Sequence, residues 1–177
     1  MQRVKDEELF KLEFLVPGHP EKRTVLLSPE MNVLMSGPWE SSEMADRCMR
    51  LRADLENVLA GGRLVVCWTP GKGRDNHQVG RLDPIDDNIF DIRSVDPSPG
   101  LRAIFHFAEK DVLVVHLCSP RSVPIPWLHR IPLLDRSSKA WRNALAESKR
   151  NWSTLFPKFE PHAGNDVHDY ISNAFLV

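Results

Sequence analysis

The stretch LRAIFHFAEKDVLVVHLC, residues 101–118, decides the fold, because two apolar runs flank a short charged turn. Alternating apolar residues on both sides of Glu109-Lys110 predict a β-hairpin closed by that two-residue turn. In the resulting register Phe107 lies opposite Val112, and Phe105 lies opposite Val114. One face of the hairpin then carries an apolar set that we expect to face the core: Leu101, Ala103, Phe105, Phe107, Val112 and Val114.

The opposite face of the hairpin carries most of its polar side chains. Arg102 and His106 lie on it, Arg121 joins them where the second strand continues, and Arg93 can join from the preceding strand. Guanidinium groups stay charged and match phosphate oxygens with a pair of donors. On an RNA ligand, arginines would stabilise the charge that grows when a 2′-hydroxyl attacks the adjacent phosphate, and His106 would accept the proton.

The same arginines allow an alternative interpretation. Each can form an ion pair with an acidic neighbour on a solvated sheet face, because surface charges are common and most contribute little. The acidic neighbours are Asp91, Asp96 and Asp111.

Further regular elements are predicted on both sides of the hairpin. Strands are predicted at 9–16, 24–28, 63–68, 89–95, 101–108 and 112–119. Helical spacing of apolar residues predicts a long helix over 44–59 and a second helix over 141–156, which begins after Ser137 or Ser138. The proline-dense segment 122–132 is expected to have no regular structure, and the C-terminal segment is expected to add one or two helical turns. This order predicts an α+β fold, an antiparallel sheet with both helices packed on one face.

Composition narrows the class of protein. The 177 residues fit a single domain, and the 42% of hydrophobic residues can bury a substantial core. Three cysteines (Cys48, Cys67 and Cys118) without a CxxC spacing argue against a disulfide framework or a zinc site, so no metal or other cofactor is predicted. The charged N-terminal segment lacks the apolar stretch of a signal peptide, and no apolar run approaches the ~20 residues of a membrane helix. We therefore expect a cytoplasmic protein without a membrane partner.

The net charge of −1 is unevenly distributed along the chain. Residues 120–158 contain eight Lys and Arg against two acidic residues, and Arg142 on the second predicted helix belongs to this basic segment. The loop TPGKGRDNHQVGR, residues 69–81, adds Lys72 and Arg74, which could close over a phosphate although the P-loop order of residues is missing. Lys72, Arg74 and Arg142 are therefore candidate substrate-binding residues, and an ordinary surface loop beside a solvated helix face is the alternative.

Residues 89–152 resemble the RelE/ParE superfamily of small toxins, and the HigB-like branch in particular. Phe90-Asp91-Ile92-Arg93 is similar to the family's first strand motif, and Arg102-Ala103-Ile104-Phe105 is similar to the second. Val112–Leu117 followed by Arg121-Ser122 is similar to the third, and the segment Trp141–Trp152 stands where the family has its C-terminal helix.

The resemblance implies a ribosome-dependent mRNA endonuclease that a partner antitoxin neutralises. It implies that Arg93, Arg102 and Arg121 contact or cleave RNA, and that a RelE-like core spans 40–156, with extra N-terminal strands in 1–36 and a C-terminal extension over 157–177. Two features depart from the family. One long helix is predicted where the family has a pair, and residues 89–123 contain four basic and four acidic side chains. Local neutrality counts against RNA binding, which depends on Lys and Arg.

Two functional hypotheses follow from these observations. The first is a toxin-type mRNA endonuclease in which Arg102 and Arg121 hold the scissile phosphate, Arg93 supports them and His106 accepts a proton. Its partners would be RNA, the ribosome and an antitoxin protein. The second hypothesis is a non-catalytic protein-interaction module on the same scaffold, with an origin in a mobile element. It is favoured by the neutral sheet and by an aromatic-rich tail: Trp127, Trp141, Trp152, Phe156 and Phe159.

Overall fold

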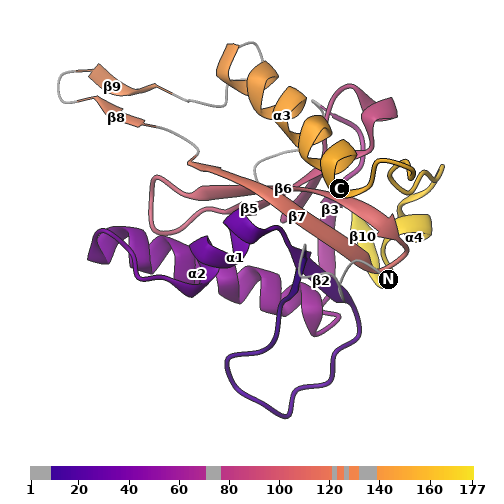
Figure 1. Ribbon diagram of the computed structural model, residues 1–177, viewed down its shortest axis with the longest axis horizontal. Coiled ribbons are helices and arrows are strands. Elements are labelled where there is room, and N and C mark those ends of the chain that lie inside the picture. Colours follow the sequence, from indigo (N-terminus) through magenta and orange to yellow (C-terminus); the bar gives the residue numbers. More distant parts are fainter. Residues whose placement is uncertain (1–8, 71–76, 121–122, 126–127, 132–138) are drawn as a thin grey trace.

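The computed structural model is a mixed α+β fold in which helices cover both faces of one large sheet (Figure 1). The structure describes the backbone of residues 9–70, 77–120, 123–125, 128–131 and 139–177, and the side chains of these ranges outside 120–131. The α+β class predicted from the sequence is confirmed.

The predicted three-stranded meander forms the centre of the sheet. β5 (Ile89–Ser94), β6 (Leu101–Glu109) and β7 (Val112–Pro120) pair in antiparallel order, and β4 (Val79–Arg81) extends the meander beyond β5. The four remaining strands are β1 (Phe10–Lys11), β2 (Thr24–Leu27), β3 (Leu64–Cys67) and β10 (Ala174–Leu176). The strand order is β1-β2-β7-β6-β5-β4-β3-β10.

The sheet is mixed, so the prediction of a purely antiparallel sheet is wrong. β2 runs parallel to β7, and β3 runs parallel to both β4 and β10. Parallel neighbours need a crossover connection, usually helical. The helical connection from β2 to β3 carries the chain from one side of the meander to the other.

That connection contains two helices, α1 (Pro29–Ser36) and α2 (Ser42–Leu59), where the sequence predicted one. The side chain of Ser28 caps α1 by accepting from the Met31 backbone N–H, and Pro29 occupies the first turn. Ser41 caps α2 in the same way through Met44. The apolar spacing that predicted α2 is confirmed, because its buried residues are Cys48, Leu51, Leu55, Val58 and Leu59.

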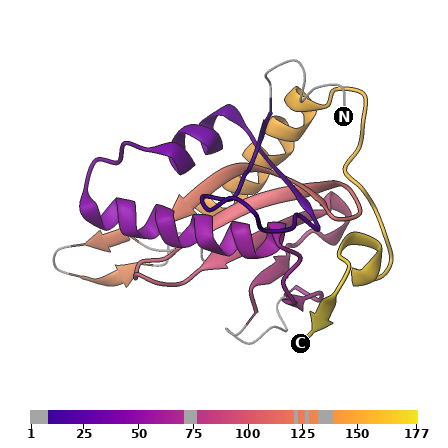
Figure 2. The ribbon, with the colours of Figure 1, turned by 90° about the horizontal axis from the view of Figure 1, so that it is seen from below.

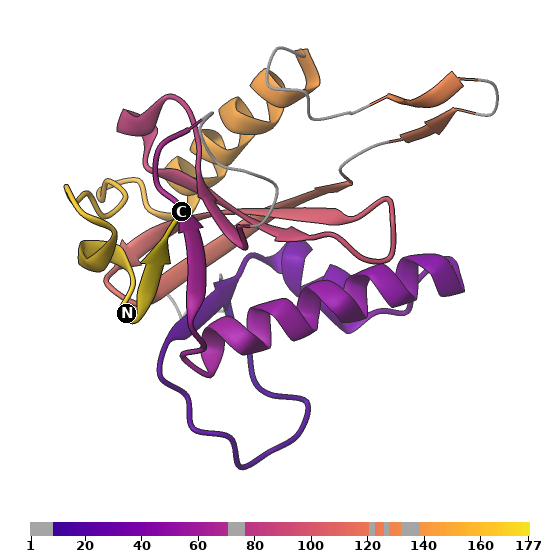
Figure 3. The ribbon, with the colours of Figure 1, turned by 180° about the vertical axis from the view of Figure 1, so that it is seen from behind.

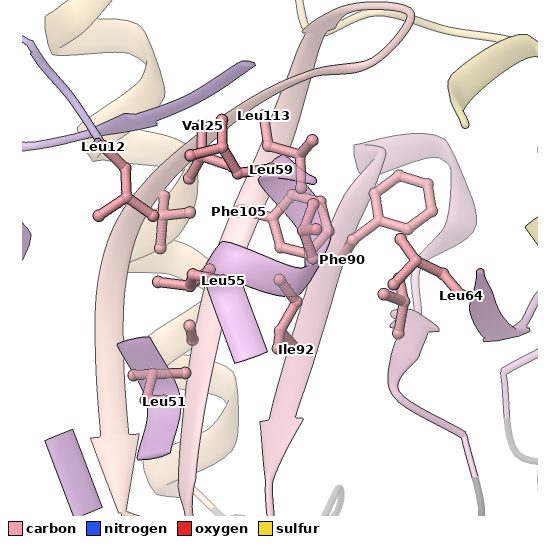
Figure 4. Close-up of a cluster of buried hydrophobic side chains, with 14 of the residues drawn as sticks. Leu12, Val25, Leu51, Leu55, Leu59, Leu64, Phe90, Ile92, Phe105 and Leu113 are labelled. Atoms are coloured by element: carbon pink, nitrogen blue, oxygen red, sulfur yellow. The ribbon is translucent and has the colours of Figure 1, made fainter. Parts of the chain in front are cut away.

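The two long helices lie on opposite faces of the sheet, so the prediction that both pack on one face is wrong (Figures 1 and 2). α1 and α2 cover the face that we call the α2 face, where side chains of α2 pack against Phe90, Ile92 and Phe105 (Figure 4). α3 (Lys139–Leu155) covers the other face, the α3 face, through Trp141 and Trp152. The strands β5, β6 and β7 are therefore buried from both sides.

The register of the central hairpin differs from the predicted one by a residue. Glu109 pairs with Val112 and Phe107 pairs with Leu113, so the turn is Lys110-Asp111, with Asp111 at φ 60°. Leu113 and Val115, rather than Val112 and Val114, therefore face α2. A second irregularity leaves His116 without an opposite residue, because Phe105 pairs with Val115 and Ile104 pairs with Leu117. Val114 and His116 lie on the face that carries His106 by ordinary alternation, and the bulge places Leu117 on that face as well, where it packs near Ile104.

Arg23 links the C-terminal segment around Ser172 to the end of α2 and to the turn between β6 and β7. Its buried guanidinium donates to the carbonyl oxygens of Val58 and Gly62 at the end of α2 and pairs with Asp111 at 3.1 Å. It also donates to the carbonyl of Ser172, whose backbone N–H donates to Asp111 at 2.8 Å. The predicted partner of Asp111 was a sheet arginine; its partner is Arg23 instead.

The remaining elements are short. A 3₁₀ turn, η2 (Ile85–Asp87), precedes β5, and α4 (Val167–Tyr170) supplies the predicted helical turn near the C-terminus. The proline-dense segment contains a two-stranded ribbon, β8 (Val123–Ile125) with β9 (Leu128–Ile131), that extends from the sheet (Figures 1 and 3). Its prediction as irregular structure is wrong, because in a two-stranded ribbon both strands are edge strands, where proline is tolerated.

Candidate functional site

The predicted site residues Arg93 and Arg102 meet on the α3 face, where both contact one buried carboxylate. They lie directly opposite each other across β5 and β6. Arg102 Nη1 lies 3.1 Å from Asp91 Oδ2, and Arg93 Nε donates to the same oxygen at 3.3 Å. Asp91 is fully buried, and each arginine side chain is 7% exposed. The two cations are thus bound to an internal anion.

The alternation of β5 explains why Asp91 reaches both arginines. Residues two apart on a strand share a face, so Asp91 lies beside Arg93 and diagonally across from Arg102. Like charges directly opposite each other in a sheet are destabilising, and a carboxylate between them offsets that repulsion. The pairing with Asp91 is the arrangement that the alternative interpretation of the sequence anticipated, although it is buried rather than solvated.

Gly80 of β4 leaves room for this carboxylate. Gly80 pairs with Asp91 across the sheet, and a Cβ atom on Gly80 would lie 2.5 Å from Asp91 Oδ1. The same Cβ would lie 3.1 Å from Nε2 of His77, a buried histidine that therefore flanks the carboxylate. Any larger residue at position 80 would displace the Asp91 side chain.

α3 closes the site from outside. The Trp141 ring lies 5.0 Å from the Arg102 guanidinium carbon, within the range of a cation–π contact. Trp141 is 3% exposed and packs with Leu145 against Ile104 of β6. Further along α3, Asn151 donates to the backbone carbonyl of His116.

His106 lies deeper under α3 and does not share the arginine cluster. Its Nδ1 lies 2.7 Å from Nε2 of His116, and its ring packs against Trp152 at a centroid distance of 5.1 Å. Burial, and to a lesser extent the charge of Lys149, lowers the pKa of His106 to about 3. Burial also lowers the pKa of His116 well below the usual value. Both imidazoles are therefore neutral at pH 7, and His106 is 1% exposed. A general base has to reach its substrate and titrate near the working pH, which this environment disfavours.

The structure describes one of the four other predicted site residues, and it lies away from this cluster on the surface of α3. Arg142 lies exposed on α3. Lys72, Arg74 and Arg121 lie outside the described residues. Of the four predicted site residues that the structure describes, Arg93 and Arg102 are the two that it brings together.

Sequence reasoning did not assign site roles to Asp91, His77 and Trp141. The period-2 pattern of β5 was a sufficient signal for Asp91, because it places Asp91 and Arg93 on one face. No local signal identifies His77 or Trp141, since both reach the cluster through long-range packing.

The described side chains offer no metal centre and no reactive thiol in this region. Within the described ranges, no three His, Cys, Asp or Glu side chains are grouped closely enough to hold a metal ion. The three cysteines are free, and burial raises the pKa of Cys118 to about 12, so its nucleophilic thiolate form is suppressed. Over the same ranges, no helix has the length and apolar character required to cross a membrane.

Comparisons with family models, with curated proteins and with solved structures find no match to this chain. The interpretation of the site therefore depends on its geometry.

Proposed function

We propose that this chain is a non-catalytic protein-interaction module on an α+β scaffold. The observation that carries the proposal is the buried Asp91 carboxylate, which binds both Arg93 and Arg102 beneath α3. In a catalytic phosphate site the cationic side chains contact the substrate, whereas Arg93 and Arg102 contact a carboxylate of the protein itself. The buried, neutral pair of His106 and His116 favours a structural role for the same face.

The aromatic residues of the tail contribute little binding surface. Trp141 and Trp152 are buried between α3 and the sheet, and Phe156 is half-buried. Among the tail aromatics whose side chains are described, Phe159 is the exposed one. Their main contribution is to anchor α3 to the sheet, so they are not the surface that a partner would contact.

A better partner surface is the outer edge of β10. Phe175 and Leu176 are each nearly half exposed, and residues 171–177 contain no charged side chain. Among the described strands none pairs with the outer edge of β10, so the backbone N–H and C=O groups of that edge have no strand partner in the described sheet. Exposed apolar edge strands accept an added strand, and the partner we propose is therefore an extended, apolar segment of another protein.

The experiment that tests this proposal compares two substitutions at one position of β10. The Val177 N–H bonds to Val66 of β3, and N–H groups alternate sides along a strand, so the Leu176 N–H points outward. Leu176→Pro removes that outward donor, whereas Leu176→Ala keeps it. We expect a co-purifying partner to be lost from the proline variant and retained by the alanine variant. Equal retention by both variants would contradict strand addition at β10.

A second candidate function is the toxin-type mRNA endonuclease of the RelE/ParE superfamily, acting with the ribosome and controlled by an antitoxin. The observation in its favour is the pair α1 and α2, which stands between β2 and β3 where that family has a helix pair. Tightly induced expression in a bacterial host separates the two functions, with the Arg102→Ala/Arg121→Ala variant as control. Growth arrest by the wild type alone would favour the endonuclease, and normal growth with both soluble proteins would favour the module.

A further inference from the structure

Two guanidinium groups, those of Arg93 and Arg102, meet at one buried carboxylate. One arginine is sufficient to neutralise Asp91, yet a second lies directly opposite the first. Both guanidinium groups lie in a region from which α3 excludes solvent. Guanidinium groups bind carboxylate and phosphate oxygens through charge-assisted hydrogen bonds, and here two of them share one oxygen.

We infer that Arg93 and Arg102 form an oxyanion-binding site that Asp91 occupies as an internal ligand. The inference is independent of the proposed protein-interaction function, because it concerns the buried cluster and not the edge of the sheet. In this arrangement Asp91 Oδ2 takes the position of an oxygen of an external carboxylate or phosphate. The site is closed as long as the Asp91 side chain fills it.

The contacts of the carboxylate support this assignment. Both arginine contacts go to Oδ2, at 3.1 and 3.3 Å, while Oδ1 has no hydrogen-bond partner in the described part of the chain. Oδ1 lies instead above Gly80, a position without a side chain. The carboxylate is therefore held through one oxygen by two cations, and the space around the other oxygen depends on a glycine.

Removing the carboxylate should convert the closed site into an open one. In Asp91→Ala the backbone stays in the strand, and the lost carboxylate leaves a space of its own size beside two guanidinium groups. A small external oxyanion can enter this space and restore the contacts to Arg93 and Arg102. Formate matches the lost group in size and shape, and inorganic phosphate tests whether a larger tetrahedral oxyanion is accepted.

The experiment is thermal unfolding of wild type and Asp91→Ala in sodium formate, sodium phosphate and sodium chloride at equal ionic strength. We expect formate to raise the melting temperature of Asp91→Ala saturably relative to chloride, by about 3–5 °C at tenfold excess over its Kd. The wild type should show no difference between formate and chloride, because its site is filled. A shift with phosphate as well would identify a phosphate-sized site, and a shift with formate alone would identify a carboxylate-sized one.

The matched control is Asp91→Ala/Arg102→Gln, which keeps the space but removes one cation. We expect the formate-specific shift to disappear in this variant. Equal melting temperatures of Asp91→Ala in formate, phosphate and chloride would overturn the inference, and so would an equal formate shift in the control. If Asp91→Ala does not fold in chloride, recovery of its circular dichroism spectrum in formate or phosphate supports the inference. Failure to fold in all three salts contradicts it.

Discussion

The two faces of the sheet are held to their helices by different kinds of interaction. On the α2 face, buried residues of α2 pack against an aromatic cluster in which Phe90, Phe105 and Phe107 lie with ring centroids 5.1–5.7 Å apart. On the α3 face, apolar contacts alternate with buried polar groups, namely the Asp91 cluster and the imidazole pair of His106 and His116.

This difference predicts how each face responds to substitution. Apolar packing is non-directional, so a lost side chain costs transfer free energy and leaves a cavity. Buried polar pairs depend on both partners, so a lost partner leaves the other uncompensated. On the α2 face, the free energy of unfolding should therefore depend mainly on the volume of the buried side chains. On the α3 face, it should depend on the charge of the buried side chains and on pH.

The largest effect of a single substitution is expected on the α2 face, from Phe105→Ala. Phe105 is fully buried, so its truncation should lower the free energy of unfolding by about 3–5 kcal/mol. Denaturant unfolding at pH 7 and pH 5 measures the loss. The loss should be the same at both pH values, because no proton is involved; a loss below about 1 kcal/mol would contradict close packing on this face.

Acid should destabilise the α3 face through its two histidines. Burial lowers the pKa of His106 to about 3, whereas in the unfolded chain a histidine titrates near 6.5. Below pH 6.5 the unfolded chain therefore binds more protons than the folded one, and stability falls as the pH falls. The expected slope is about 1.4 kcal/mol for each pH unit and each histidine, and this contribution is constant above pH 6.5.

Denaturant unfolding between pH 7.5 and 4.5 tests this slope. The matched control is His106→Leu/His116→Leu, in which apolar side chains replace the buried pair. We expect a flatter pH profile for the double variant than for the wild type. Parallel profiles would show that other groups cause the acid sensitivity.

The smallest effect is expected from Lys149→Ala, at the outer side of α3. Lys149 pairs with Asp87 at 2.7 Å, but its side chain is 54% exposed, so the pair should contribute less than about 1 kcal/mol. Arg50→Ala, which breaks the pair with Asp54 on α2 and removes a side chain that is 57% exposed, is the matched variant on the other face. Thermal unfolding should place both variants close to the wild type. A much larger loss for Lys149→Ala would mean that surface charge, rather than the buried polar groups, holds α3.

The elements that the sequence predicted correctly are those set by local periodicity. The meander and α2 follow from alternation and from helical spacing, and the shared face of Arg93 and Arg102 follows from the same alternation. The hairpin register was not predictable in this way, because the irregularities beside Phe107 and Ile104 each insert one residue.

The position of α3 depends on long-range packing. The uninterrupted apolar run Leu113-Val114-Val115 is typical of a strand buried on both faces, and it was the available signal that a helix covers each side of the sheet. Because the sequence does not show where α3 packs, it could indicate only that the arginines share a face. It could not indicate that Trp141 would close that face or that His106 would be buried.

A double-mutant cycle between Asp91 and Arg102, measured by denaturant unfolding at pH 7, tests directly whether the buried carboxylate binds the arginine beneath α3. The variants are Asp91→Asn, Arg102→Gln and their combination, and a cycle of Asp91→Asn with Arg52→Gln on α2 serves as the control. If the arginine is bound by an internal carboxylate, the coupling free energy should be at least about 1.5 kcal/mol, against additivity within about 0.5 kcal/mol in the control. Additivity of Asp91→Asn and Arg102→Gln would mean that the two charges act independently, and it would contradict a closed, internally neutralised α3 face.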